Sequence, residues 1–421
     1  MLQTDQSTTT QFISALQIPD FRKLISLNFF LTLSLLMLEV LVSYELYLVT
    51  KDPLSLGLIG LAIAIPYISL SLVGGHFADK QNKKVIMFFS MFALFIISLL
   101  FLLIFNSNTN EYISLSQKVM LIYLFFGIAG FARGFYQPAA SSFRPYLLPR
   151  NLYANGSTWN STAWQLGTIL GSILAGFCYT QFGIEISILI SSSFLAISIL
   201  LLLLIKTKSP SLLKLENEHA TIFTSIQEGF SFVLNNKILL YSISLDLVAV
   251  LFAGAIAILP VFAQDILNIG ASGLGWLRAA PSLGAFLGLL LMTKFSPMNK
   301  AWRNMILAAS GFGIATIIFA VSTNIYLSLF MLFFTGAFDS ISVVIRGSLL
   351  QIIPPDHLRG RVLAVNNIFV SSSNEVGAFE SGLAAKLFGT VRSVVFGGIA
   401  TLIVIGTVYF NSKELLDKEI Q

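Results

Sequence analysis

The sequence predicts an all-α membrane protein whose twelve transmembrane helices form two six-helix halves with pseudo-twofold symmetry. Three observations predict this fold: a composition poor in charge, apolar stretches that tile the chain, and a helix-pair pattern that occurs twice. Of the 421 residues, 56% are hydrophobic and 11% are charged, and the mean hydropathy is +0.83. A soluble domain would carry about 25% charged residues. Lipid rather than water is therefore the main solvent of this chain.

Apolar stretches long enough to cross a bilayer follow one another along nearly the whole chain. A spanning helix needs about 20 mostly apolar residues, and length and periodicity place twelve of them. The uncharged region 304–338 is too long for one helix, so Ser322, Thr323 and Asn324 are the expected turn that divides it. The predicted spans are 24–50, 54–77, 84–105, 119–143, 157–181, 183–205, 238–264, 272–293, 303–322, 325–349, 362–388 and 392–411.

One helix-pair pattern occurs twice. Gly60 and Pro66 precede a charged loop, and Gly275 and Pro281 repeat that spacing 215 residues later, ahead of a second basic loop. Internal duplication of this kind is typical of membrane transporters, whose halves are repeats of one another.

The duplication predicts an N-terminal six-helix half, residues 1–205, and a C-terminal six-helix half, residues 238–421. Residues 206–237 are the expected cytoplasmic linker, because they contain the only extended polar stretch between spans. Within the linker, residues 222–234 place apolar side chains at helical spacing, which predicts an amphipathic helix on the membrane surface. We interpret the linker as a tether, with a regulatory role as the alternative.

Lysine and arginine side chains predict the orientation. Most of the 25 lie in alternate loops, whereas the opposite face has only Lys51, Lys118, Lys386 and Arg392. Cytoplasmic loops are enriched in such residues. We therefore expect a multi-pass protein of the plasma (inner) membrane with both termini in the cytoplasm. The net charge of +5 follows from this topology and does not indicate nucleic-acid binding.

Several classes of chemistry are not expected. The single cysteine, Cys178, excludes an internal disulfide and a cysteine-based zinc site, and the three histidines are scattered. The sequence has no Gly-x-x-x-x-Gly-Lys-Ser/Thr motif, so it does not bind ATP through a P-loop. We predict no enzyme activity, no metal and no cofactor. Any uphill work would need an ion gradient or a partner.

Residues 75–84, Gly-His-Phe-Ala-Asp-Lys-Gln-Asn-Lys-Lys, resemble the loop signature of the major facilitator superfamily: a glycine, an aspartate four residues later, then basic residues. Asn82 stands where glycine is usual, and asparagine also tolerates a left-handed turn. The chain is similar, over essentially its whole length, to the exporter group that contains the enterobactin exporter. The stretches that carry this likeness include 19–22, 229–234, 356–362 and 373–382.

The resemblance implies a cytoplasmic gate. In the superfamily, the loop aspartate and its basic neighbours latch the two halves, and the aspartate approaches the start of the eleventh helix, here near Arg361. A helix N-terminus stabilises a carboxylate, which makes this contact physically sensible. The alternative is a polar turn required by topology alone. The implied gate residues are Gly75, Asp79, Lys80, Lys83 and Lys84.

A glycine-rich segment, residues 167–176, resembles the signature of superfamily antiporters. Its glycines are Gly167, Gly171 and Gly176, and Ser172 stands where that signature normally has proline. Ordinary close packing of helices through small residues is the alternative interpretation.

Charged residues inside predicted spans are the strongest site candidates, because an ionised group in the bilayer is costly unless it faces a cavity or a partner. In the resembled fold, helices one, four, seven and ten line the central cavity. Structural ion pairing, for example of Arg346 with Asp246 or Asp339, is the alternative. The proton-coupling candidates are Asp246, Glu39 and Glu375, in that order, and the other cavity charges are Arg133, Asp339, Arg278 and Arg346.

The sequence therefore predicts secondary active export of a small organic molecule by alternating access, driven by proton influx. A siderophore is the substrate that the resemblance favours, and drug or macrolide efflux is the alternative within this class. A non-transporting membrane sensor or assembly partner is a rival from another class, and import is a further alternative. The expected partners are the substrate, protons and the lipid bilayer, and we expect a monomer.

Overall fold

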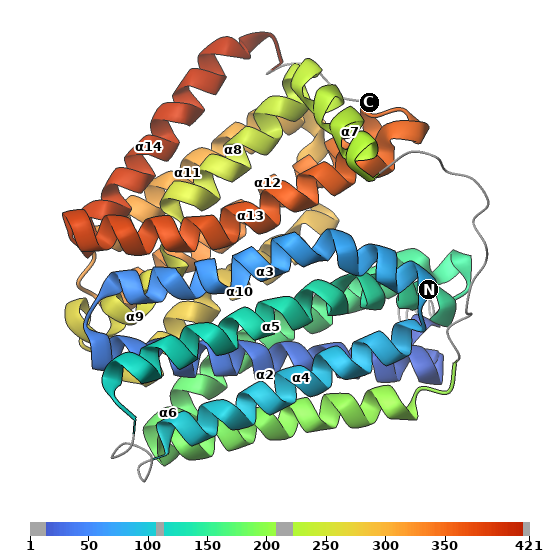
Figure 1. Ribbon diagram of the computed structural model, residues 1–421. Coiled ribbons are helices and arrows are strands. Elements are labelled where there is room, and N and C mark those ends of the chain that lie inside the picture. Colours follow the sequence, from blue (N-terminus) through green and yellow to red (C-terminus); the bar gives the residue numbers. More distant parts are fainter. Residues whose placement is uncertain (1–13, 107–112, 208–221, 416–421) are drawn as a thin grey trace, which may run out of the picture. The chain divides into compact units, whose positions relative to one another are not determined.

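The structure is a computed structural model that describes residues 14–106, 113–207 and 222–415. For residues 71–80, 222–226, 253, 356–357, 368 and 371–372 it describes the backbone only. The regular structure in these described parts is helical, without a strand (Figure 1). The predicted all-α class is confirmed.

In the described residues, five long helical runs precede the linker. They are α2 (Pro19–Thr50), α3 (Pro53–Lys80), α4 (Lys83–Phe105), α5 (Leu115–Phe143) and α6 (Tyr153–Leu204). The last of these is two helices in one run, because Gly183 has φ 75° and ψ −179°. Those angles favour glycine and lie outside the helical region. The break falls at the first residue of the predicted span 183–205, two residues after the predicted span 157–181 ends.

Helix α7 (Ile222–Asn235) lies within the expected linker, and α8 (Lys237–Ala253) begins at its end. Short turns then follow, namely η5 (Ala255–Ile258), α9 (Leu259–Val261) and η6 (Phe262–Ile266). The predicted span 238–264 is therefore not one continuous helix: it ends before Gly254, and Pro260 lacks the N–H that a helix interior needs. The remaining helices are α10 (Gly270–Lys294), α11 (Ala301–Val321), α12 (Ile325–Ile352), α13 (Asp356–Phe388) and α14 (Thr390–Asn411).

The predicted turn at residues 322–324 is confirmed. Helix α11 ends at Val321 and α12 begins at Ile325. The side chain of Asn324 accepts hydrogen bonds from the backbone N–H groups of Tyr326 and Leu327, at 2.8 and 3.3 Å. A side-chain acceptor at this position satisfies N–H groups that have no partner within the helix.

Ten segments of the described chain are long and apolar enough to cross a membrane. Helix α6 counts once among them although it is broken at Gly183, and the charged helix α13 is not among them. The membrane class is thus supported directly, whereas the number twelve and the twofold symmetry stay predictions.

The chain divides into two compact units. The first consists of Met1–Glu45 and Ala62–Lys214, and the second of Leu46–Leu61 and Leu215–Gln421. Both divisions near residues 45 and 61 fall inside helices, α2 and α3. The domain limits that the sequence predicts stay predictions.

Close helix packing holds the second unit together. A Cβ atom at Gly284 of α10 would overlap the carbonyl oxygen of Phe333 on α12, and one at Gly336 would overlap that of Pro281. Glycines let two backbones approach this closely, which gains dispersion contacts in a medium where the hydrophobic effect is weak. The two helices are therefore packed backbone to backbone.

The core of the second unit lies among α8, α11, α12, α13 and α14. Trp302 is fully buried there, and its indole N–H donates to the Ser412 hydroxyl at 2.9 Å. Helix α7 contributes Val233, which is 2% exposed, to the same core. Its Gly229 lies against the carbonyl oxygen of Arg361, and its Glu228 forms an ion pair with the Arg361 guanidinium. Helix α7 therefore packs on the second unit as well as being amphipathic.

Candidate functional site

Asp246 and Arg346 form a buried ion pair within the second unit. Asp246 lies on α8 and Arg346 on α12, and the guanidinium contacts the carboxylate directly. Both side chains are 6% exposed. The sequence left two carboxylates open as partners for Arg346, and the structure pairs it with Asp246.

The pair constrains what Asp246 can do. Removing one partner of a buried ion pair typically costs about 3–5 kcal/mol, because the other charge is left uncompensated. A proton on Asp246 has the same effect, since it neutralises the carboxylate and leaves the Arg346 charge buried. Asp246 therefore takes a proton readily only when another anion or water reaches Arg346.

Asp339 lies on the same helix as Arg346, seven residues earlier. Its side chain is half-buried. Seven residues span about 10.5 Å along a helix axis, which places the two groups two turns apart. Asp339 and Arg346 thus share a face of α12.

Glu375 and Glu380 lie half-buried on α13. A Cβ atom at Gly60 would lie 3.7 Å from the Glu375 carboxylate, so the first turns of α3 run beside this side chain. Glu380 lines a small hollow together with Phe252, Ala384 and Val394. Both carboxylates border helix contacts of the second unit.

Arg278 on α10 donates a hydrogen bond to the carbonyl oxygen of Ile256 at 3.3 Å. Ile256 lies in the irregular segment that follows α8, where regular helical hydrogen bonds are interrupted. A guanidinium is well suited to satisfy such carbonyl groups. This predicted cavity charge therefore has a structural contact in the second unit.

The first unit holds the predicted candidates Glu39 and Arg133. Glu39 lies half-buried on α2 and Arg133 half-buried on α5. The Nε atom of Arg133 is buried and makes no hydrogen bond within the described part of the chain. A buried donor without a partner is costly, which makes this guanidinium a candidate for contact with a ligand.

A polar chain across three helices of the first unit was not predicted. The Tyr136 hydroxyl on α5 donates to the Asn28 side chain on α2 at 3.0 Å. The Asn28 amide in turn donates to the Asn160 side chain on α6 at 2.8 Å. Uncharged polar residues inside apolar stretches were the only available signal, and such residues are common in membrane helices.

The antiporter-like glycines on α6 pack closely against α2. A Cβ atom at Gly167 would lie 2.9 Å from the Phe29 carbonyl oxygen, and one at Gly171 would lie 2.5 Å from that of Leu33. The Gly176 carbonyl accepts the Thr180 hydroxyl at 2.8 Å. The structure therefore shows that Gly167 and Gly171 allow close packing of α6 on α2. The antiporter role stays a prediction.

The predicted gate is described only in part. Residues Gly75, Asp79 and Lys80 end helix α3, and their side chains lie outside the described residues. Lys83 is 5% exposed, and its ammonium lies 5.4 Å from the ring centroid of Tyr146. Neither observation tests the gate, which stays a prediction.

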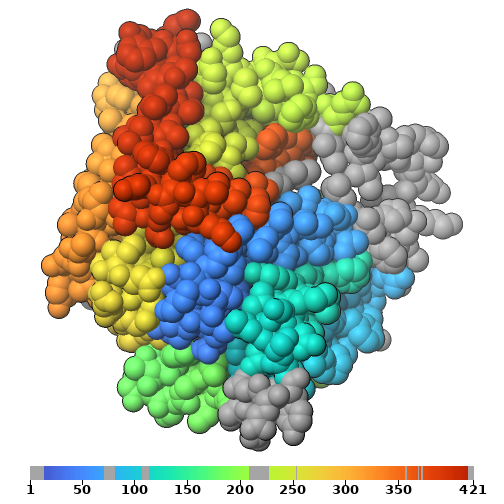
Figure 2. All heavy atoms as spheres, turned by 60° about the vertical axis from the view of Figure 1, so that its left-hand side comes forward, coloured from blue at the N-terminus to red at the C-terminus, as the bar shows by residue number. Residues whose placement is uncertain are grey.

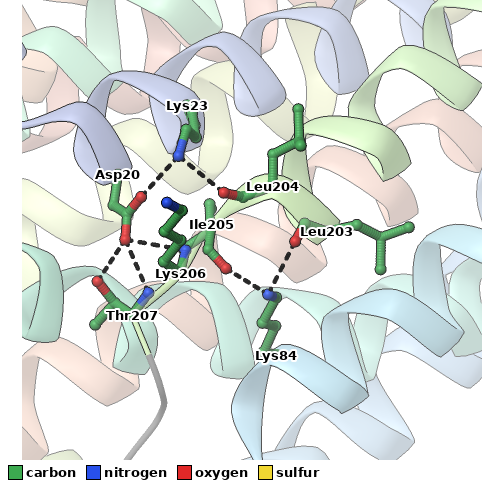
Figure 3. A network of polar contacts seen from close by, with 8 residues as sticks. All are labelled: Asp20, Lys23, Lys84, Leu203, Leu204, Ile205, Lys206 and Thr207. Atoms are coloured by element: carbon green, nitrogen blue, oxygen red, sulfur yellow. Dashed lines mark hydrogen bonds and ion pairs between the residues drawn. The ribbon is translucent and has the colours of Figure 1, made fainter.

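Lys84 takes part in a polar network that joins α2 and α4 to the end of α6 (Figure 3). Its ammonium donates to the carbonyl oxygens of Leu203 and Ile205 at 3.3 and 2.5 Å. These carbonyls belong to the last turn of α6, where partners within the helix are missing and a positive charge is favourable.

Asp20 anchors the chain that leaves α6. Its carboxylate accepts the backbone N–H groups of Lys206 and Thr207 and the Thr207 hydroxyl, at 3.1, 2.8 and 2.7 Å. Lys23 bridges this carboxylate and the Leu204 carbonyl, at 2.9 and 2.8 Å (Figure 3). The start of the linker is therefore fixed to the first unit.

Comparison with known proteins decides the family. The profile of the Major Facilitator Superfamily matches residues 24–378, which is most of the chain. The chain belongs to the major facilitator superfamily. This superfamily is one of transporters rather than enzymes, in agreement with the prediction from sequence.

Two relatives and a solved structure illustrate the likeness to this superfamily. The uncharacterized MFS-type transporter YfmI of Bacillus subtilis (strain 168) is 23% identical over 320 residues, 72% of this chain and 75% of that protein. The enterobactin exporter EntS of Escherichia coli O1:K1 / APEC is 24% identical over 389 residues, 92% and 90% of the two chains. A bacterial homolog of the human lysosomal transporter Spinster superposes with a TM-score of 0.72 at 16% identity, over 96% and 99% of the two chains.

Proposed function

We propose that this chain exports a small organic molecule of the siderophore type across the plasma membrane, by alternating access coupled to proton influx. Membership of a transporter superfamily supports transport. The similarity to the enterobactin exporter over 92% of the chain supports export and this substrate class.

The buried Asp246–Arg346 pair is the observation that carries the mechanism. A bundle held together by packing alone gains little from two ionised groups in its interior, because replacing such pairs by apolar residues is often neutral or stabilising. Ionisable groups within membrane helices are therefore functional candidates. This argues for transport over a purely structural or sensory bundle.

Three carboxylates are proposed to carry the coupling proton: Asp246, Glu39 and Glu375. Asp246 is held by Arg346, so its protonation depends on what else reaches that guanidinium. Glu39 and Glu375 are half-buried, on α2 and α13. An alternating-access cycle needs one of them to be charged in one packing of the helices and neutral in the other.

The proposed topology has twelve crossings and both termini in the cytoplasm. Helix α6 has 52 residues, about 78 Å if straight, which is more than twice the thickness of the hydrocarbon core. Its break at Gly183 supports two crossings. Helix α13 has 33 residues, enough for one crossing in spite of its charges.

Flux into sealed vesicles tests the proposal. The purified protein is reconstituted in proteoliposomes with enterobactin outside, a macrolide is tested in parallel, and an opposing proton gradient is imposed and then abolished with an ionophore. We expect enterobactin uptake that depends on the gradient and on the protein. Uptake of the macrolide alone supports drug efflux, and no flux of either compound contradicts the proposed function.

A further inference from the structure

Helix α8 ends inside the predicted span 238–264, and its carbonyl end packs on α13. Ala253 is the last residue of α8, and an α-helix leaves its final carbonyl groups without partners in the helix. A Cβ atom at Gly377 of α13 would lie 3.0 Å from the carbonyl oxygen of Val250, in this last turn. Helices α8, α13 and α14 adjoin one another within the second unit, as the lime, orange-red and red surfaces in Figure 2. A helix end with negative partial charge therefore lies where three helices meet.

Glu380 places a carboxylate beside this helix end. It lines the same small hollow as Phe252, which belongs to the last turn of α8. Among the described residues, none gives the Glu380 carboxylate a hydrogen bond or an ion pair. A helix C-terminus favours cations, and an ionised group within a membrane helix is costly without a partner. The described chain thus brings two negative groups to one hollow without a positive charge between them.

The basic side chains of neighbouring segments bind elsewhere. The Arg278 guanidinium donates to the Ile256 carbonyl oxygen at 3.3 Å, and the Lys386 ammonium pairs with the Asp52 carboxylate at 2.6 Å. Neither basic residue lines the hollow, and Glu380 is the one charged residue among the described residues that do. The compensating positive charge is therefore left to a bound ion.

The other polar side chains of the hollow offer acceptors rather than donors. The Ser381 hydroxyl donates to the Gly254 carbonyl oxygen at 3.3 Å, and the Ser393 hydroxyl donates to the Thr390 carbonyl oxygen at 2.8 Å. A hydroxyl has one hydrogen, so these bonds leave only the lone pairs of both oxygens free. The hollow has a volume of about 10 Å³ for the centre of a water-sized sphere, which is room for about one small ion or water. Oxygen ligands of this kind suit a hard cation.

We propose that this hollow binds one Na⁺ ion, with the Glu380 carboxylate as its charged ligand and the hydroxyls of Ser381 and Ser393 as neutral ligands. A monovalent cation balances the single carboxylate, whereas a divalent cation would leave an excess charge in a membrane segment. The carbonyl end of an interrupted membrane helix is a recurring part of Na⁺ sites. Scattered histidines and a single cysteine argue only against metals that prefer nitrogen and sulfur ligands. The site does not rest on the proposed function, because Glu380 is not among the proposed proton carriers.

Thermal stability in detergent tests the site. The melting temperature of the purified protein is measured in NaCl, KCl and choline chloride at equal ionic strength, which keeps the anion and the screening constant. We expect Na⁺ to raise the melting temperature in a saturable way, because a ligand that binds only the folded state stabilises it. Choline is too large for the hollow and should have no such effect, and K⁺ should act more weakly than Na⁺. Equal melting temperatures in the three salts would mean that the hollow holds water alone, and would overturn the proposal.

A pair of amide variants assigns the effect to Glu380. Glu380→Gln should weaken the apparent affinity for Na⁺ at least about tenfold, because an amide cannot replace a charged ligand. Glu45→Gln is the matched control: this carboxylate also lies in a membrane helix, but it accepts a hydrogen bond from the Tyr179 hydroxyl at 2.6 Å in the first unit. The control should keep the wild-type response. A wild-type response in Glu380→Gln, or an equal loss in Glu45→Gln, contradicts the site.

A pair of hydroxyl variants keeps the test decisive if Glu380→Gln does not fold. Ser393→Ala should also weaken the response to Na⁺, because it removes one ligand oxygen. Ser348→Ala is its control, since the Ser348 hydroxyl makes the same kind of bond within its own helix, to the Val344 carbonyl oxygen at 2.9 Å, away from the hollow. Equal responses of Ser393→Ala and Ser348→Ala would refute the proposal. These measurements need no substrate and no gradient, so absent flux with intact Na⁺ binding overturns the proposed function and not this site.

Discussion

Asp246 and Arg346 act as one buried ion pair rather than as two separate charges. Each alone is a costly group in a membrane helix, and each compensates the other. The pair can serve transport only if another group compensates the Arg346 charge when Asp246 takes a proton. Its contribution to stability can be measured directly.

Asp246→Asn should destabilise the protein by about 3–5 kcal/mol, because it leaves the Arg346 guanidinium buried without an anion. The double variant Asp246→Asn/Arg346→Gln should recover much of this loss, since no uncompensated charge remains. Thermal unfolding in detergent, followed by the loss of monodisperse protein, measures both. Equal destabilisation in the single and double variants would show that the two side chains are not energetically coupled.

The sequence predicted which residues are candidates but not how they pair. Charges within apolar stretches identified Asp246 and Arg346, yet Asp339 shares a helix face with Arg346 and was an equally good partner. The contact of Arg278 with the Ile256 carbonyl depends on a break in the backbone that periodicity does not show. The ion pairs of Asp52 with Lys386 and of Asp265 with Lys51 were missed, because charges near the ends of spans are ordinary.

At the scale of elements, length and hydrophobic period predicted most helices well. The turn at 322–324 and the division of residues 153–204 were both found, because each interrupts an apolar run with turn residues or glycine. The break after Ala253 was missed, since the apolar character continues through Ala263 and hides the loss of helical hydrogen bonds. The close crossing of α10 and α12 was not predicted, because its only trace in the sequence is the glycines Gly284 and Gly336.

Gly336→Ala should destabilise the protein by about 1–3 kcal/mol, the usual cost of forcing an extra group into a packed site. Its Cβ atom would overlap the Pro281 carbonyl, so α10 and α12 would have to separate. Gly406→Ala is the control, because nothing lies within 4 Å of a Cβ atom there. Melting temperatures in detergent compare the two. A Gly336→Ala protein as stable as Gly406→Ala would refute the close crossing.

At the scale of the whole molecule, twelve crossings and cytoplasmic termini are the claim that all other assignments use. Single cysteines at Gln81, Ser211 and Asn299, in a Cys178→Ser background, should be shielded from an impermeant thiol reagent in intact cells. Cysteines at Asn108 and Thr390 should react. Labelling at Ser211 from outside would overturn both the orientation and the number of crossings.

The central claim is that proton movement is coupled to substrate export through a buried carboxylate. The decisive measurement is substrate-driven proton movement in proteoliposomes of wild-type protein and of Asp246→Asn, Glu39→Gln and Glu375→Gln, together with substrate binding. We expect the wild type to exchange protons for substrate. At least one amide variant should lose that exchange while it still binds substrate, because an amide cannot carry the proton. Full proton-coupled flux in all three variants would contradict the account and make these carboxylates structural.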